Sequence, residues 1–168
     1  GITLLGDTLK FVAGPQTDYF RSPDGSVVNN SAVIFTEVDN TKPFTFTAKV
    51  QPEFTETGTY SAGVIYAYEN DTHCQKLCFE QDEYGDHRVV SVRTLGTSDD
   101  NNHQAITAPY VYMRLSSDGT TLGSYFSEDG KIWRMARLYK NDFPEKLLIG
   151  ISSQSPKDNE HTCLFTEV

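Results

Sequence analysis

The stretch Phe44-Thr45-Phe46-Thr47-Ala48-Lys49-Val50 alternates between apolar and polar residues at every position. Successive side chains of a β-strand point to opposite faces, so this pattern predicts a half-buried strand. Phe44, Phe46, Ala48 and Val50 form its core face. No window of about a dozen residues elsewhere in the chain shows the apolar spacing of an amphipathic helix. The segment therefore indicates an all-β protein.

Similar strand patterns recur along the chain, in segments 8–12, 32–38, 61–68, 74–81, 87–95, 110–116, 121–127, 132–139, 147–153 and 162–168. Turn sequences that accept a positive φ separate several of these segments, namely Asp24-Gly25, Tyr84-Gly85-Asp86, Asp118-Gly119 and Asp129-Gly130. Many short strands at near-regular spacing predict a two-sheet antiparallel jelly-roll sandwich. We expect one domain over residues 1–168, with a single helical turn near 141–145, where Pro144 suits a first turn.

Charge and length exclude several classes of partner. The formal net charge is -9 with a pI near 4.8, and the Lys and Arg residues are scattered along the sequence, so we expect no nucleic-acid partner. No apolar run approaches the roughly 20 residues of a membrane-spanning helix, so we expect no membrane partner. Cys74 and Cys78 lie too far apart on one strand for a disulfide, which favours reduced thiols and a cytoplasmic protein.

Three motifs have ordinary structural interpretations. Ser127 to Trp133 is similar to the Asp-box hairpin of sialidase propellers, but a single copy favours a hairpin held by Asp129 and Gly130, with Trp133 in or near the core. Ser98 to His103 is rich in oxygen ligands, but it lacks the Gly and distal Glu of a Ca²⁺ loop, so we expect a solvated loop. The Cys and His spacing matches no zinc site. We therefore expect no metal and no cofactor.

A pair of carboxylates on one strand is typical of glycosidases. The segment Phe79-Glu80-Gln81-Asp82-Glu83 is similar to the E-x-D-x-x-E strand of retaining glucanases. Gly85 occupies the position of the third carboxylate. This departure disfavours glucanase activity.

Polar residues also occupy the second face of several predicted strands. Lys76 and Glu80 oppose the apolar Leu77 and Phe79, and Tyr112 and Arg114 similarly oppose Val111 and Met113 on the segment 110–116. If these strands are neighbours, one sheet presents aromatic rings and charged groups that suit a sugar. A solvated face with cross-strand ion pairs is an equally good interpretation.

The chain resembles the family of domain of unknown function 1349, which includes regulation-of-enolase proteins. The segments that carry the resemblance are Thr17 to Arg21, Lys76 to Glu80, Val90 to Val92, Ser98 to Asp100, Ser127 to Trp133 and Gln154 to Pro156. The family is similar in fold to the concanavalin A-like lectins and glucanases, which implies a jelly roll with one concave sheet. The resemblance also implies one polar cluster on that sheet, made of Asp18, Arg21, Lys76, Glu80, Arg114 and Gln154.

Our leading hypothesis is a non-catalytic carbohydrate-binding protein, with an anionic sugar as a candidate ligand. Its ligand-binding residues would be Asp18, Arg21, Lys76, Glu80, Tyr112, Arg114, Tyr125, Trp133 and Gln154. One alternative is a glycoside-active enzyme that uses Glu80 and Asp18 as its carboxylate pair. The other is a protein-interaction module that regulates a metabolic enzyme.

Overall fold

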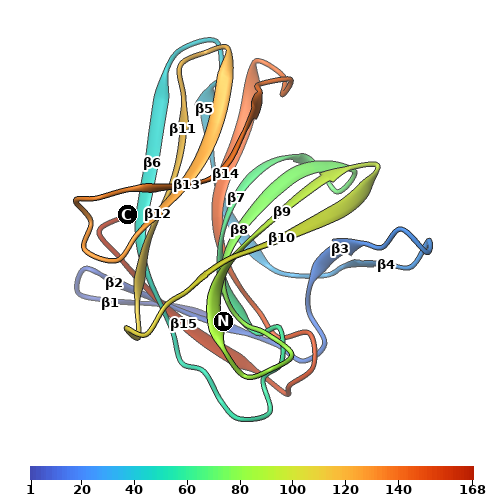
Figure 1. Cartoon of the computed structure of the whole chain (residues 1–168), viewed down its shortest axis with the longest axis vertical. Helices are drawn as coiled ribbons and strands as arrows, with labels where there is room; N and C mark the ends of the chain where they lie inside the picture. Colours follow the sequence, from blue (N-terminus) through green and yellow to red (C-terminus); the bar gives the residue numbers. More distant parts are fainter.

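The chain, described over residues 1–168 by a computed structural model, consists of antiparallel strands and contains no helix. A seven-stranded sheet has the order β1 (Ile2–Leu5), β2 (Thr8–Ala13), β15 (His161–Thr166), β6 (Phe44–Pro52), β11 (Val111–Ser117), β12 (Thr121–Ser127) and β13 (Arg134–Lys140). A six-stranded sheet has the order β10 (Thr97–Ala105), β9 (His87–Leu95), β8 (His73–Gln81), β7 (Ala62–Asn70), β14 (Lys146–Gln154) and β5 (Val33–Asp39). A hairpin, β3 (Tyr19–Arg21) and β4 (Val27–Asn29), projects beyond the six-stranded sheet (Figure 1).

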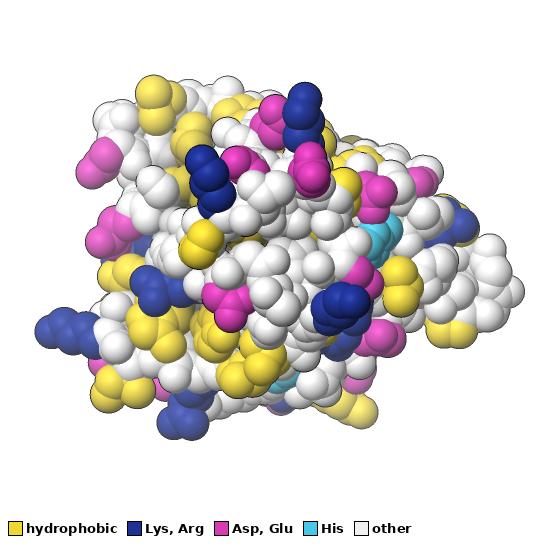
Figure 2. Space-filling view, turned by 90° about the horizontal axis from the view of Figure 1, so that it is seen from above, with side chains coloured by type: hydrophobic (Ala, Val, Ile, Leu, Met, Phe, Trp, Pro, Cys, Tyr) yellow, Lys and Arg dark blue, Asp and Glu magenta, His cyan; other side chains and the backbone are white.

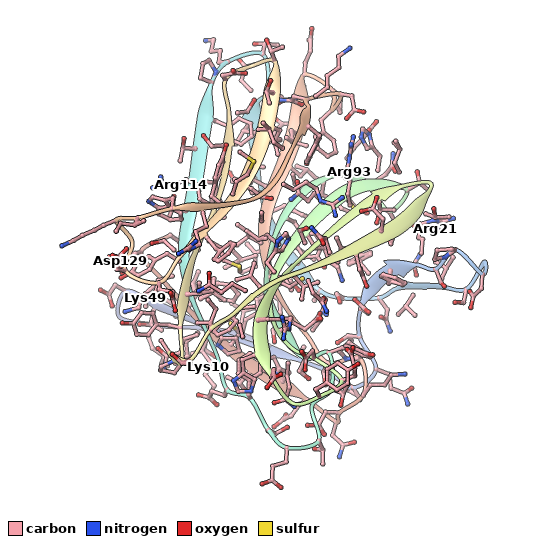
Figure 3. The ribbon with its side chains drawn as sticks, viewed as in Figure 1. Lys10, Arg21, Lys49, Arg93, Arg114 and Asp129 are labelled. Atoms are coloured by element: carbon pink, nitrogen blue, oxygen red, sulfur yellow. The ribbon has the colours of Figure 1, made fainter.

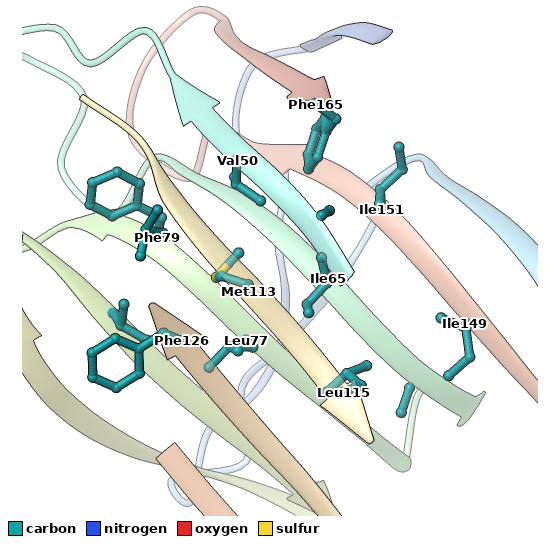
Figure 4. Packing of buried hydrophobic residues seen from close by; sticks show 14 of the residues in the cluster. Val50, Ile65, Leu77, Phe79, Met113, Leu115, Phe126, Ile149, Ile151 and Phe165 are labelled. Carbon is teal, nitrogen blue, oxygen red and sulfur yellow. The ribbon is translucent and has the colours of Figure 1, made fainter. Parts of the chain in front are cut away.

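The two sheets enclose the main hydrophobic core. Alternate residues of the central strands point inward, as the pattern of Phe44 to Val50 predicts. Together with Ile106 and Phe143, which lie outside the strands, they form a cluster of 20 buried residues. Met113 and Leu115 of the seven-stranded sheet contribute to it together with Leu77 and Phe79 of the six-stranded sheet (Figure 4). The predicted jelly-roll sandwich of two antiparallel sheets is confirmed.

A second apolar cluster lies on the outer face of the six-stranded sheet. Its six buried members are Ala62, Val64, Tyr66, Cys78, Val90 and Val92. Tyr19 and Phe20 of the β3–β4 hairpin pack against it, and the Tyr19 ring meets the Tyr66 ring edge-on with the centroids 6.0 Å apart. The hairpin therefore covers part of the face that a two-layer sandwich leaves open.

Local structure differs from the prediction in two segments. Residues 98–103, expected to be a solvated loop, belong to β10, which pairs with β9 from Thr97 to Ala105 with a bulge near its end. The helical turn expected near 141–145 is wrong. This segment is a loop held by amide side chains, because Asn40 donates to Asn141 Oδ1 at 3.0 Å and to the Pro144 carbonyl at 3.0 Å.

The three cysteines and the Asp129 hairpin are as the sequence predicts, whereas Trp133 is not. Cys74, Cys78 and Cys163 are free and buried, as expected. Asp129 Oδ1 accepts hydrogen bonds from the backbone N–H groups at 131 and 132, at 2.8 and 2.9 Å, so the predicted tie of this hairpin is confirmed. Trp133 belongs to neither apolar cluster, and its expected place in the core is wrong. The chain has no helix that could span a membrane.

The two sheets approach each other closely at Gly63. A Cβ atom at this position would lie 2.4 Å from Cys163 Sγ and 2.5 Å from a Val50 methyl group. Because the core is close-packed, we expect Gly63→Ala to lower the free energy of unfolding by about 1–3 kcal/mol. Urea denaturation followed by fluorescence measures this loss. Gly14→Ala is the matched control, because nothing lies within 4 Å of a Cβ at that position. If both changes lowered the free energy of unfolding equally, the close packing of the two sheets at Gly63 would be contradicted.

Candidate functional site

A pocket of about 1040 Å³ opens between the outer face of the six-stranded sheet and the β3–β4 hairpin. Strands β8, β9, β10 and β14 supply its sheet side, and the segments around residues 16–20, 60 and 154–157 supply its walls. The lining residues are Gln16, Asp18, Phe20, Val28, Tyr60, Lys76, Glu80, Glu83, Val92, Asp100, Asn101, Asn102, Gln154, Pro156 and Lys157. Only four of these 15 residues are hydrophobic, so the pocket is suited to a polar ligand.

Lys76 provides the central charge of the pocket. Its side chain is 3% exposed, and its Nζ donates to Asp18 Oδ1 at 2.8 Å and to Gln154 Oε1 at 3.0 Å. Burial by itself would lower the pKa of this amine, but the negative charge of Asp18 raises it well above its usual value. Lys76 is therefore a fixed ammonium group rather than a proton acceptor.

The hairpin presents Asp18 to this amine. Asp18 lies directly before β3, where its backbone N–H donates to Asn30 Oδ1 at 3.1 Å and its Oδ1 accepts from the Tyr19 N–H at 2.7 Å. Packing of Tyr19 and Phe20 on the sheet fixes the position of the hairpin. Asp18 is thus a held acceptor, with a side chain 19% exposed to the pocket.

Gln154 connects Lys76 to a second carboxyl group. Its Nε2 donates to the Tyr60 carbonyl at 2.9 Å and lies 3.4 Å from Glu80 Oε1. Strand register explains the arrangement, because Gln154 and Glu80 both pair with Ala62, from opposite sides of β7. Four polar side chains, Asp18, Lys76, Gln154 and Glu80, therefore form one continuous chain of contacts.

Burial changes the acidity of two carboxyl groups in the pocket. It raises the pKa of Glu80 to about 8, although the nearby Lys76 acts in the opposite direction. Burial also raises the pKa of Asp100, which lies on β10 and lines the same pocket. At neutral pH Glu80 is mostly protonated, so it has a proton to donate in a hydrogen bond.

The charges around the pocket are predominantly acidic. The lining includes the carboxylic acids Asp18, Glu80, Glu83 and Asp100, but only the cations Lys76 and Lys157. Our expectation that several cations would favour an anionic sugar is therefore wrong for this pocket. Its electrostatics disfavour an anionic ligand.

The structure brings together some of the predicted site residues. Asp18, Lys76, Glu80 and Gln154 line the pocket. Arg21 lies nearby on β3 but points away from the pocket, where its Nε donates to the Gly96 carbonyl at 2.9 Å. Figure 3 shows Arg21 between the hairpin and the turn that joins β9 to β10.

Tyr112, Arg114, Tyr125 and Trp133 do not belong to this cluster. Tyr112 and Arg114 lie on β11 and Tyr125 on β12, and all three are on the outer face of the seven-stranded sheet. The Arg114 guanidinium lies over the Trp133 ring, 3.9 Å from its centroid. The prediction of one shared polar face is wrong, because the strands that carry these residues belong to the opposite sheet from Lys76 and Glu80.

Sequence reasoning missed several residues that line the pocket, chiefly Tyr60, Asp100 and Asn102. Asp100 belongs to the Ser98 to Asp100 motif, which we interpreted as part of a solvated loop. Every family motif except Ser127 to Trp133 supplies at least one residue that lines the pocket. The place of Asp100 in a family motif was the signal that could have identified it.

Several solved structures are similar in fold to this chain. A protein from Saccharomyces cerevisiae described as functionally unknown superposes with a TM-score of 0.89 at 21% identity, over 99% of this chain and 89% of that one. The GH43 BlXynB protein from Bacillus licheniformis gives 0.69 at 14% identity, over 94% of this chain and 31% of that one. The exoplasmic/lumenal domain of VIP36, in a form bound to Ca²⁺ and Man3GlcNAc, gives a TM-score of 0.59 at 8% identity, over 98% of this chain and 79% of that one.

The fold is therefore a β-sandwich of the concanavalin A-like lectin and glucanase class. Within this class, the family described as "Protein of unknown function (DUF1349)" matches residues 3–168, and the chain belongs to that family. No curated protein matches the chain. The resemblance inferred from the motifs is confirmed.

The raised pKa of Glu80 predicts a pH-dependent stability. The folded protein holds the Glu80 proton up to about pH 8, whereas the unfolded chain loses it near the ordinary value of about 4.3. The stabilisation due to this proton is fully present below the unfolded pKa and is lost as the pH rises to about 8. Glu80→Gln should thus become more stable relative to the wild type across this range, by about 1–3 kcal/mol, and then level off. Urea denaturation at several pH values measures the difference.

The exposed Glu37→Gln on the edge strand β5 is the matched control for this experiment. If the difference between Glu80→Gln and the wild type did not change with pH, the burial of the Glu80 carboxyl would be contradicted.

Proposed function

We propose that the pocket binds an uncharged saccharide. The observation that carries this proposal is the connected chain of Asp18, Lys76, Gln154 and Glu80 at the side of a 1040 Å³ polar pocket. The chain presents both donors and acceptors at fixed positions, which is what the hydroxyl groups of a sugar require. Phe20, Val28 and Val92 add apolar surface for the C–H faces of the ring.

The structural neighbours support a carbohydrate-related role. They include GH43 proteins and a VIP36 domain in a form bound to Man3GlcNAc. This similarity extends to the fold, and function depends on the particular site. The argument for a saccharide therefore rests on the composition of the pocket.

The ion pair between Asp18 and Lys76 favours binding over catalysis. A retaining glycosidase requires a free carboxylate that attacks the sugar, opposite a second carboxyl about 5 Å away. Asp18 instead holds the Lys76 ammonium at 2.8 Å. Two side chains, Lys76 and Gln154, lie between it and Glu80 in the chain of contacts.

We place the protein in a reducing, cytoplasmic compartment on the basis of its buried free thiols.

A panel of neutral oligosaccharides, screened on an array and then by calorimetry, tests the proposal. The wild type should bind at least one of them. The double variant Asp18→Asn/Lys76→Met removes the charged pair while keeping side chains of similar size, and we expect it to weaken binding at least tenfold, or about 1.4 kcal/mol. Removing both partners avoids leaving one buried charge unpaired.

Lys42→Gln, in the exposed turn between β5 and β6, is the control and should bind like the wild type. No binding of any neutral oligosaccharide by the wild type would overturn the proposal. Stoichiometric capture of a protein partner without any saccharide response would favour the regulatory module instead.

A second candidate function is glycoside hydrolysis with Glu80 as the proton donor. The observation in its favour is the pKa of Glu80, raised to about 8 by burial, which keeps a transferable proton on this carboxyl at neutral pH. In this reaction Glu80 would protonate the leaving-group oxygen, and Asp18 would be the carboxylate of the pair.

Chromogenic glycosides distinguish an enzyme from a binding protein. If Glu80 is the general acid, the wild type releases p-nitrophenol, the rate falls as the pH rises through about 8, and Glu80→Gln lowers the rate at least about 100-fold. Retained binding of the neutral oligosaccharide by Glu80→Gln shows that the site is intact. The absence of turnover by the wild type would reject catalysis.

A further inference from the structure

The charges of this protein are divided unevenly between its parts. The strands of the seven-stranded sheet contain none of the 23 Asp and Glu residues of the chain. They contain six of its 14 Lys and Arg residues, namely Lys10, Lys49, Arg114, Arg134, Arg137 and Lys140. An acidic protein thus has one sheet without a single carboxylate side chain.

Four of these cations lie on the outer face of that sheet. Lys10, Lys49, Arg114 and Lys140 occupy outward positions on β2, β6, β11 and β13, by their pairing with the inward core residues. None of them forms an ion pair, whereas Arg137 turns inward and binds Asp99 at 2.5 Å. Figure 3 shows Lys10, Lys49 and Arg114 on the side away from Arg21 and Arg93.

Aromatic rings lie between these cations. Lys49 Nζ is 4.1 Å from the centroid of the Tyr110 ring and 5.7 Å from that of Tyr112. Arg114 lies over Trp133 and donates from its Nε to Thr47 Oγ1 at 2.9 Å. The charged groups are therefore held in place by contacts that leave their charge without a counter-ion.

Two glycines let tyrosine rings lie along the sheet. A Cβ at Gly123 would be 2.4 Å from the Tyr125 hydroxyl oxygen and 2.7 Å from a ring carbon, and a Cβ at Gly130 would be 3.3 Å from the Tyr112 ring. Both rings lie against a residue without a side chain, and both tyrosines are partly exposed. Such a surface suits a flat ring that stacks on it.

Two carboxylates border this face, and neither belongs to its strands. Asp129, in the turn after β12, accepts two backbone N–H groups through its Oδ1. Glu167 follows β15 and lies close to Tyr112. Figure 2 shows Lys and Arg side chains among hydrophobic ones on the left, with a few Asp and Glu side chains beside them; this is the side on which β6, β11, β12 and β13 lie in Figure 1.

We propose that this outer face binds an acidic polysaccharide in which carboxylate or sulfate groups alternate with neutral sugar rings. The rings would stack on Tyr112 and Tyr125, and the anionic groups would bind Lys49 and Arg114. The site is distinct from the acidic pocket, which lies on the other sheet, and it does not depend on what that pocket binds.

The spacing of the cations favours this ligand over a nucleic acid. In the strand register Lys49 pairs with Tyr112 and Arg114 with Thr47, which places the Cα atoms of Lys49 and Arg114 diagonally on neighbouring strands, about 8 Å apart. Lys10 is two strands from Lys49, at about 12 Å. Each strand of duplex DNA carries a charge about every 3.4 Å, which is far denser. The acidic remainder of the protein would also repel such a polymer.

Fluorescence titration with short oligosaccharides tests the proposal. The probes are oligosaccharides of hyaluronan, with one carboxylate per disaccharide, of κ-carrageenan, with one sulfate per disaccharide, and of uncharged dextran. We expect the wild type to bind one or both acidic probes and to bind dextran at least about tenfold more weakly. Binding should weaken as NaCl is raised from about 0.02 to 0.3 M, because salt screens exposed charges.

Two variants separate charge from stacking. Lys49→Gln/Arg114→Gln should weaken binding of the acidic probe at least about tenfold and reduce its salt dependence, because two charged partners are lost. Tyr125→Leu should weaken binding severalfold but keep the salt dependence. Lys42→Gln/Lys146→Gln changes the net charge equally at exposed positions, and it should bind like the wild type. Thermal unfolding confirms that each variant is folded.

Three outcomes would overturn the proposal. The first is that the acidic probes bind no more tightly than dextran, and the second is an equal effect of the two double charge variants. The third is tighter binding of a thymidine oligonucleotide, or of vesicles containing phosphatidylserine, with the same loss in Lys49→Gln/Arg114→Gln. The pocket variant Asp18→Asn/Lys76→Met should bind the acidic probe normally, so this test and that of the pocket can fail separately.

Discussion

The ammonium group of Lys76 is buried on the outer face of a β-sheet, and a buried charge without a partner is strongly destabilising. Its partner, Asp18, is not on the sheet at all. Asp18 is supplied by the β3–β4 hairpin, 2.8 Å away, and the hairpin is held in turn by the packing of Tyr19 and Phe20. This ion pair, together with the Lys76–Gln154 hydrogen bond, links the hairpin, the pocket wall that it forms and Gln154 to the charge on the sheet.

The two outer faces of the sandwich have opposite electrostatic character. The six-stranded sheet carries an acidic pocket in which Glu80 keeps its proton near neutral pH. The seven-stranded sheet carries unpaired cations and tyrosine rings that lie along its surface. A net charge of -9 describes neither face. Average charge therefore predicts poorly what each surface of this protein attracts.

The strands that the sequence predicted well are those with a buried face. Phe44 to Val50 alternates clearly because one side of β6 contacts the core and the other contacts water. The sequence Thr97 to Ala105 has no such pattern, since β10 is an edge strand with mostly polar residues, and we took Ser98 to His103 for a loop. The short strands β3 and β4 were also missed, because three residues are too few to show a period.

The residues of the candidate site were also predicted only in part. Periodicity correctly assigned Lys76 and Glu80 to the face opposite Leu77 and Phe79. It could not show that Arg114 belongs to the other sheet, because alternation reports only whether a side chain points toward the core. The outer faces of the two sheets therefore show the same alternation of polar and apolar residues in the sequence, although the core separates them.

The sequence by itself determined the class of fold, the inward and outward side of each long strand, and the motifs that supply most of the pocket. Tertiary structure alone decided which outward faces lie together. The order of strands within a sheet depends on hydrogen bonds between segments far apart in the chain, such as β8 with β7 and β9, or β11 with β6. For this reason Asp18 reaches Lys76 across 58 positions of sequence, while Arg114 faces the opposite way.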